Sequence, residues 1–466
     1  MKTLWLVFLL SVTSISKAQT ISIVPLPTKQ QLSWHEKEFY LFVHFGPNTF
    51  TDKEWGEGTE PEDIFNPTQL DCRQWARVAK TSGAKGIIIT AKHHDGFCLW
   101  PSKFSKHTVR ESKWKDGKGD VLRELSQACR EAGLNFGVYI SPWDRNHPDY
   151  GTEKYNDVFA GMIKEVLKDY GPVWELWWDG ANGEGPNGKK QVYDWRKFEN
   201  TVRQVSPKTV VFSDIGPDIR WVGNENGIAG DPNWNFLDTA GYKRGLGSPP
   251  MDTLNHGNYN GKQWIPAECD VSIRPGWFWH ANEDDKVKTP EQLFNIYLKS
   301  VGRGANLLLN VPPDRRGLIN EKDETALAGF KKLRDESFGD NLLKTARTFY
   351  EFRPKDVTFR SVDSNGVFGA NIQNFVVELS GEKRINCIVL REAIHFGQTV
   401  RKFNIVLYKG TKMVSEIKGT SVGRKRILTF PVKSITSFKV YLEDTRGNDN
   451  ISGVAAYLLD ERLTEK

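Results

Sequence analysis

The stretch VWELWWDGANGEGPNG, residues 173–188, begins as a short apolar β-strand and breaks off at one carboxylate, Asp179. A glycine-rich loop follows the acid, and Trp174, Trp177 and Trp178 precede it. Aromatic rings beside a carboxylate at a strand end are typical of a carbohydrate site, because the rings stack on pyranose C–H groups and the acid can act at an anomeric carbon. A buried tryptophan cluster with an aspartate that caps a helix explains this stretch equally well, so the rest of the chain has to decide.

Strand-like and helical runs alternate on both sides of this stretch, from about Phe39 to Arg334. The predicted strands are residues 40–45, 86–90, 135–140, 173–178, 209–213, 265–270 and 305–311. The predicted helices lie near residues 68–82, 120–132, 156–170, 193–205 and 290–302. Alternation over roughly 300 residues indicates a parallel sheet with helical crossovers, and this length favours an α/β fold of the (β/α)8 barrel type over a doubly wound sheet.

Polar residues follow or end most of these strands. They are His44, His93, His94, Tyr139, Asp179, Asp214, Glu268 and Asn310. In a barrel of parallel strands the carboxyl ends share one rim, which carries the loops that build active sites. A single such residue could be a helix cap, but the whole set predicts an active site at this rim.

After about Asp340 the pattern changes to short alternating stretches between Gly, Asn and Lys turns. Residues 375–379, 387–391, 403–408 and 437–442 are typical of β-strands in an all-β module. We therefore expect a catalytic barrel over residues 19–342 and a C-terminal β-sandwich domain over residues 343–466. The β-domain either binds carbohydrate or only packs against the barrel.

The N-terminus has the pattern of a cleavable secretion signal over residues 1–18. Lys2 precedes an apolar segment, and Ser16-Lys17-Ala18 forms a small-x-small cleavage site. The apolar segment is too short to span a bilayer, and no cysteine near the cleavage site indicates a lipid anchor. We expect a periplasmic or secreted protein without a membrane anchor.

Charge and cysteine content exclude several classes of function. The formal net charge of +6 is spread along the chain without a dense basic run, which gives no support to nucleic-acid binding. The five cysteines are scattered without a CxxC pair, so neither a disulfide framework nor a zinc site is expected. His93 and His94 lack the HxH or HExxH spacing of metal ligands, and hydrogen bonding to sugar hydroxyls is the better interpretation. We expect no metal and no cofactor.

A retaining glycosidase needs two carboxyl groups about 5–5.5 Å apart, one as nucleophile and one as acid/base. Candidates are Asp95, Asp144, Asp179, Asp214, Asp218, Glu225, Glu268 and Asp270. Asp179 leads because it ends a buried strand among aromatics. Glu225 lies on a loop near Trp221, where partial desolvation favours its protonated form. Glu268, in or beside a predicted strand, is its rival as the acid/base.

Five motifs in this order resemble glycoside hydrolase family 29, the retaining α-L-fucosidases. They are FVHFG (42–46), EWG (54–56), KHHDGF (92–97), WWDG (177–180) and GANLLLN (304–310). The resemblance spans the predicted barrel and implies that Asp179 is the nucleophile. It also implies that His44, His93, His94 and Tyr139 contact fucose hydroxyls, and that Trp55 and Trp177 shape the subsite.

Three further stretches, GANGEGP (180–186), GPDIRW (216–221) and VSIRPGW (271–277), are similar to the subgroup that cleaves α-1,3 and α-1,4 fucosyl linkages in Lewis-type glycans. In that subgroup the acid/base lies on the loop matching residues 222–226, which implies Glu225. In the other subgroup its position is poorly fixed, so Glu268 stays open. Arg274 and Trp277 resemble rim residues near the sugar.

We therefore expect an exo-acting retaining α-L-fucosidase whose partners are fucosylated oligosaccharides or glycoconjugates. One alternative is a fucosidase with broad or α-1,2 linkage specificity. Another is a non-catalytic carbohydrate-binding protein, which would keep the aromatic rings without turnover. A metal-dependent barrel hydrolase is the third, and a chelator would inactivate it.

Overall fold

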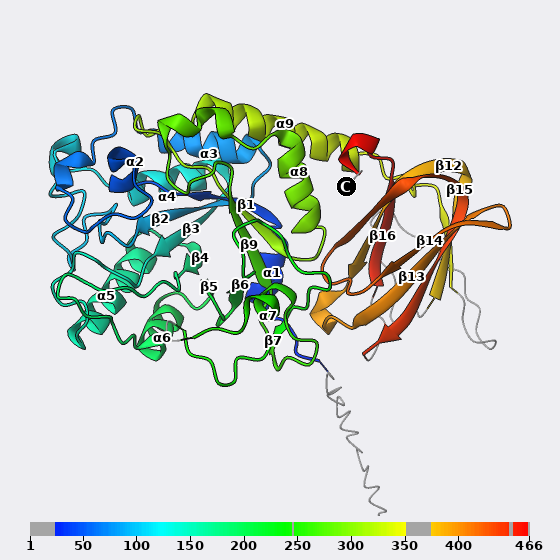
Figure 1. Cartoon of the computed structure of the whole chain (residues 1–466), viewed down its shortest axis with the longest axis horizontal. Coiled ribbons are helices and arrows are strands. Elements are labelled where there is room, and N and C mark those ends of the chain that lie inside the picture. The colour runs from blue at the N-terminus through cyan, green and yellow to red at the C-terminus, as the bar shows by residue number, and fades with distance from the viewer. Residues whose placement is uncertain (1–23, 245–246, 351–373, 447–450, 465–466) are drawn as a thin grey trace, which may run out of the picture.

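The computed structural model describes residues 24–244, 247–350, 374–446 and 451–464, and within them eight parallel strands close into a barrel (Figure 1). Around the barrel the strand order is β1-β10-β9-β6-β5-β4-β3-β2. The strands are β1 (Phe39–Val43), β2 (Gly86–Lys92), β3 (Asn135–Ile140), β4 (Val173–Trp177), β5 (Val210–Ser213), β6 (Ile219–Trp221), β9 (Ala267–Ser272) and β10 (Asn306–Asn310). The predicted barrel is confirmed. The predicted signal peptide, residues 1–18, lies outside the described residues.

Helices cover the outside of the barrel (Figure 1). The longer ones are α3 (Cys72–Thr81), α4 (Val121–Ala132), α5 (Lys154–Asp169), α6 (Trp195–Val205), α8 (Pro290–Lys299) and α9 (Glu321–Phe338). The shorter ones are α1 (Lys29–His35), α2 (Pro47–Thr51) and α7 (Met251–His256). Asp71, Asp120 and Asp194 cap the first turns of α3, α4 and α6 by accepting backbone N–H groups, which explains where these helices begin. The five predicted helices are confirmed, whereas α9 was not predicted.

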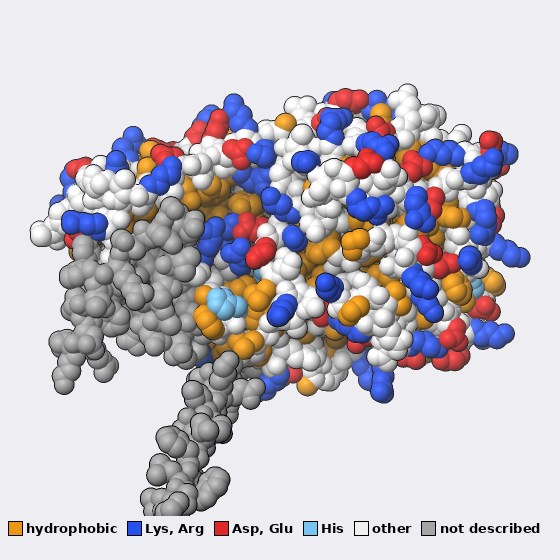
Figure 2. Space-filling view, turned by 180° about the vertical axis from the view of Figure 1, so that it is seen from behind, with side chains coloured by type: hydrophobic (Ala, Val, Ile, Leu, Met, Phe, Trp, Pro, Cys, Tyr) orange, Lys and Arg blue, Asp and Glu red, His pale blue; other side chains and the backbone are white. Residues whose placement is uncertain are grey.

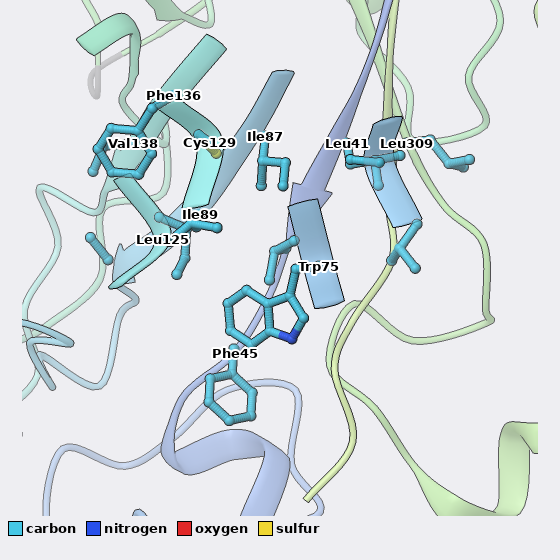
Figure 3. Close-up of a cluster of buried hydrophobic side chains, with 14 of the residues drawn as sticks. Leu41, Phe45, Trp75, Ile87, Ile89, Leu125, Cys129, Phe136, Val138 and Leu309 are labelled. Carbon is cyan, nitrogen blue, oxygen red and sulfur yellow. The ribbon is translucent and has the colours of Figure 1, made fainter. Parts of the chain in front are cut away.

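Side chains alternate between the two faces of each barrel strand, as the period of two in a β-strand requires. Leu41 of β1 and Ile87 of β2 belong to the large hydrophobic cluster that also contains Trp75 of α3 (Figure 3). Tyr40 and Phe42 of β1 belong instead to the cluster inside the barrel. This alternation determines which polar side chains reach the interior of the rim.

The β5–β6 connection departs from the simple (β/α)8 plan. β6 pairs parallel with β5 after a link of residues 214–218, too short to contain a helix. Such a short strand has no measurable hydrophobic period, which explains why the sequence analysis missed it. A long segment after β6 holds α7 and a two-stranded ribbon of β7 (Phe236–Leu237) and β8 (Gln263–Trp264).

The C-terminal domain is an antiparallel sheet, which confirms the predicted all-β module. Its strands are β11 (Arg347–Tyr350), β12 (Asn374–Glu392), β13 (Val400–Lys409), β14 (Lys412–Gly419), β15 (Arg426–Thr445) and β16 (Ile451–Tyr457). Buried side chains of β12, β13, β15 and β16 form a hydrophobic core separate from that of the barrel. Ion pairs join the domains, between Lys425 and Glu38 and between Arg426 and Asp231.

The surface carries both signs of charge. Basic and acidic side chains are interspersed over the face shown in Figure 2, as expected for a chain without a dense basic run. In the described part of the chain, no helix combines the length and the apolar character that crossing a bilayer requires.

Candidate active site

A cavity of about 220 Å³ lies at the carboxyl-terminal rim of the barrel. Its described lining comprises Phe42, His44, Glu54, Trp55, His93, His94, Tyr139, Trp177, Asp179, Ala181, Glu225, Asp270 and Trp277. Nine of the ten predicted site residues are in this set; Arg274 is not. Residues that lie far apart in the chain therefore meet at one rim, where the parallel strands place their carboxyl ends.

Asp179 directly follows β4, and two hydrogen bonds orient its carboxylate. The Tyr139 hydroxyl donates to Oδ2 over 3.1 Å, and the Ala181 backbone N–H donates to Oδ1 over 2.7 Å. The Asp179 side chain is 27% exposed, so it remains open to the cavity. A fixed, partly exposed carboxylate of this kind is suited to nucleophilic attack.

The residue after Asp179 has to be a glycine, Gly180, because of the space available there. A Cβ atom at this position would lie 2.1 Å from Oδ1 of Asp214, which follows β5. No side chain fits at this distance, so the turn after Asp179 packs directly against a second carboxyl group. Burial, and then the negative charge of Asp179, raise the pKa of Asp214 to about 6.

The three histidines of the cavity are uncharged near neutral pH. Burial lowers the pKa of His44 to about 3 and that of His94 to about 4, and it holds the pKa of His93 well below its usual value. His44 Nδ1 donates to the Asn310 side-chain oxygen over 2.9 Å, because Asn310 uses its amide nitrogen as donor to Ser272 and Trp277. Neutral imidazoles can both donate and accept, which suits sugar hydroxyls.

Aromatic rings form the walls of the cavity. Tyr139 stacks on Trp177 with ring centroids 5.3 Å apart, and Trp177 stacks on Phe212 at 4.0 Å. Trp55 is 55% exposed and meets His94 edge to face. Trp277 lies beside His44 at 5.1 Å. Rings placed in this way offer apolar faces to the C–H groups of a sugar.

Glu225 and Asp270 line the same cavity as Asp179 and are two further carboxyl groups in it. Glu225 is exposed on the loop after β6, and the Trp277 indole N–H donates to its Oε2 over 3.2 Å. Asp270 is buried on β9, and the Trp221 indole N–H donates to its Oδ1 over 2.8 Å. Burial, and then the negative charge of Glu225, raise the pKa of Asp270 well above its usual value.

Glu268 does not line the cavity. It lies two residues before Asp270 on the same strand, which places it one layer deeper on the same inward face. There it is fully buried and accepts hydrogen bonds from Trp177 and Tyr40. Burial raises the pKa of Glu268 above its usual value. Of the two rivals from the sequence, Glu225 shares the cavity with Asp179 and Glu268 lies beneath its floor.

The expected position of Arg274 near the sugar also differs from the structure. Its guanidinium is fully buried and forms ion pairs with Asp323 of α9 at 3.0 Å and with Asp284 at 2.7 Å. Arg274 lies two residues after the end of β9, and its ion pairs with these acids hold its side chain outside the cavity lining. Arg274 therefore anchors the loop that carries Trp277 to the outer helices.

Glu54 and Asp270 are lining residues that the predicted site lacked. Glu54 accepts the backbone N–H groups of Trp277 and Phe278 over 2.8 and 3.3 Å, so it ties two rim loops together. Of the EWG motif, the predicted site included Trp55 but not Glu54. Asp270 was a candidate carboxyl without an assigned role.

Four carboxyl groups line the cavity, from Glu54, Asp179, Glu225 and Asp270, and the described lining contains no lysine or arginine. Such a site favours positive charge on a bound molecule. The described residues also contain no group of three or more His, Cys, Asp or Glu side chains placed to hold a metal ion. A barrel rim with several carboxyls, neutral histidines and aromatic walls is typical of a glycoside hydrolase.

Comparison with known proteins identifies the family. The family model for α-L-fucosidase matches residues 26–332, and the chain belongs to this family, glycoside hydrolase family 29. Alpha-L-fucosidase 1 of Arabidopsis thaliana is 41% identical over 460 residues, which cover 96% of this chain and 90% of the relative.

Solved structures agree with this assignment. A family 29 glycoside hydrolase from an unknown rumen bacterium is 38% identical, with a TM-score of 0.84 over 94% of this chain and 78% of that chain. A family 29 fucosidase from Ruminococcus gnavus, solved in complex with fucose, is 28% identical. Its TM-score is 0.82, with 95% of this chain and 96% of that chain covered.

Proposed function

We propose that this enzyme is an exported, exo-acting, retaining α-L-fucosidase that releases terminal α-1,3- and α-1,4-linked fucose from Lewis-type oligosaccharides. The observation that carries the proposal is that Asp179 and Glu225 line one cavity together with neutral histidines and aromatic rings. A cavity of about 220 Å³ suits a single sugar ring, which favours action on a terminal residue.

In the first step Asp179 attacks the anomeric carbon while Glu225 gives its proton to the glycosidic oxygen. The C–O bond to the leaving sugar breaks, and fucose becomes covalently bound to Asp179. In the second step Glu225, now a carboxylate, takes a proton from water, and the resulting oxygen nucleophile displaces Asp179. Both steps pass through a positively charged sugar, which the ionised carboxyls of the cavity favour.

Sugar recognition is assigned to the side chains of the wall. His44, His93 and His94 hydrogen-bond to the hydroxyls, and Tyr139 remains on Asp179 to hold the nucleophile in place. Trp55 and Trp277 pack on the apolar faces of the ring and on its C6 methyl. The aromatic wall also limits the access of bulk water to the reacting carbon, apart from the water that Glu225 activates.

The linkage preference rests on the likeness of residues 180–186, 216–221 and 271–277 to the α-1,3/1,4-specific subgroup, and on the presence of Glu225 in the cavity. Export rests on the pattern of residues 1–18, and N-terminal sequencing of the mature enzyme should begin at Gln19.

A substrate panel tests the proposal. It contains an aryl α-L-fucoside, 2′-fucosyllactose and a Lewis trisaccharide, each assayed with and without a chelator. We expect fast, chelator-insensitive release from the Lewis sugar and little release from 2′-fucosyllactose. Efficient cleavage of 2′-fucosyllactose would refute the linkage preference, and inactivity on all three substrates would indicate a binding protein.

A further inference from the structure

We infer that Asp270 is a positioning residue for the acid/base: it stays a neutral carboxylic acid and donates a hydrogen bond to the Glu225 carboxylate that remains after proton transfer. The inference rests on the proposed role of Glu225. Asp270 is buried and lines the cavity, but it forms and breaks no bond in the two displacement steps.

The backbone brings the two carboxyls together. Asp270 lies on the inward face of β9, and Glu225 lies on the loop that leaves the neighbouring strand β6. An isolated antiparallel bridge pairs Asn226 with Val271, so each member of this bridge is the next residue after one of the two acids. This bridge ties the loop after β6 to β9. It therefore restricts movements of the loop that would separate Glu225 from Asp270.

In each of the two carboxyl groups, Asp270 and Glu225, one oxygen accepts a hydrogen bond from a tryptophan indole. One indole N–H, from Trp221, holds Oδ1 of Asp270, which leaves Oδ2 to carry a proton. Another, from Trp277, holds Oε2 of Glu225, whereas none of the described residues donates a hydrogen bond to Oε1. A proton on Asp270 Oδ2 supplies that donor, and an O–H···O⁻ hydrogen bond is among the strong ones in proteins.

The charges around Asp270 keep it neutral. The groups that face it are Glu225, from the loop after β6, and Glu268, on its own strand. On the other side, the register partner on β10 is the apolar Leu308. Burial and the nearby acids therefore oppose ionisation of Asp270, and its pKa is well above the usual value. The cavity histidines are also neutral and supply no compensating positive charge.

The consequence concerns the strength of the acid. When Glu225 gives its proton to the leaving oxygen, Asp270 retains its own and hydrogen-bonds to the new carboxylate. Glu225 thus gives up its proton more easily than it would beside an apolar side chain or an ionised acid. When water returns a proton to Glu225, the original state is restored, so Asp270 never exchanges a proton in the cycle.

Two substitutions of Asp270 test whether it acts as a neutral hydrogen-bond donor or as a negative charge. Asp270→Asn keeps a neutral hydrogen-bond donor of the same size, whereas Asp270→Leu removes the donor. We expect Asp270→Leu to move the alkaline limb of the kcat/KM profile on the Lewis trisaccharide upward by about one pH unit and to lower kcat/KM about tenfold. Asp270→Asn should leave the limb within a few tenths of a pH unit of the wild-type position.

The control and the refuting results are specific. Asp95→Asn changes another buried carboxyl of the barrel, outside the described lining, and should not move the alkaline limb. If Asp270 acts as an anion, both Asp270 variants will move the limb to lower pH, which overturns the inference. Equal upward movement in both variants overturns it as well.

A double-mutant cycle distinguishes this failure from failure of the proposed function. In a Glu225→Ala background assayed on an aryl fucoside, adding Asp270→Leu should change kcat less than twofold, because Asp270 acts through Glu225. An additional tenfold loss would mean that Asp270 has an independent role and would refute the inference alone. If Glu225→Ala shows no dependence on the leaving group, the proposed function fails first.

Discussion

Asp214 provides a quantitative test of the electrostatics beside the nucleophile. Burial, and then the charge of Asp179, raise its pKa from 3.8 to about 6. Between these two values the folded chain binds a proton that the unfolded chain has already lost. The free energy of unfolding must therefore fall as pH rises from about 4 to about 6, and it should change no further above that window on account of this group.

Replacing Asp214 with asparagine removes the titration and keeps the size of the side chain. The difference between the two pKa values corresponds to about 3 kcal/mol, because each pKa unit is worth 1.36 kcal/mol. Asp214 is deeply buried, so solvent screening reduces this value little. Relative to wild type, Asp214→Asn should gain about 2 kcal/mol of stability between pH 4.5 and pH 7.5.

Urea unfolding followed by tryptophan fluorescence is the assay. All 16 tryptophans precede residue 280, so the signal reports on the barrel and not on the β-domain. Asp340→Asn, whose side chain is 78% exposed, is the matched control and should leave the pH dependence of wild type unchanged. Parallel curves for wild type and Asp214→Asn would refute the reasoning, since they would show that Asp214 ionises normally.

The other predictions concern catalysis. Asp179→Ala should lower kcat at least about 10⁴-fold on every substrate, measured with an aryl fucoside and the Lewis trisaccharide, because no other group forms the covalent intermediate; appreciable turnover would reject Asp179 as the nucleophile. Glu225→Ala should impair the Lewis trisaccharide about 100-fold more than an aryl fucoside with a good leaving group, and azide should partly restore the latter. If Glu268→Ala shows that signature instead, the acid/base assignment is wrong. Gly180→Ala should lower kcat at least tenfold while circular dichroism stays native, because its Cβ would displace Asp214 and the attached turn; full activity would contradict the packing described here.

The sequence was sufficient for the barrel and most of the rim because each signal was local. Apolar strand runs and the polar residues that end them can be recognised from the sequence alone, and nine of the predicted site residues line one cavity. β6 was missed because three residues carry no period. α9 was missed because its few buried positions, among them Leu327 and Phe330, are separated by many charged residues.

The depth of Glu268 and Asp270 in the barrel depended on a strand boundary that the sequence did not supply. The prediction ended this strand at Asp270, whereas it continues to Ser272. That shift places Asp270 in a complete inward-facing layer and Glu268 one layer below it. Arg274 depended on partners in α9, a helix that was not predicted, so its ion pairs could not be foreseen.

The unbalanced charge of the cavity has a consequence for inhibition. The ionised carboxyls of the cavity, with no lysine or arginine in the described lining, favour small organic cations of the right shape. A fucose analogue with a protonated nitrogen in place of the ring oxygen keeps the hydroxyl pattern and adds a charge that this cavity lacks. It should bind far more tightly than fucose itself, and its affinity should weaken as rising pH removes the proton from its nitrogen.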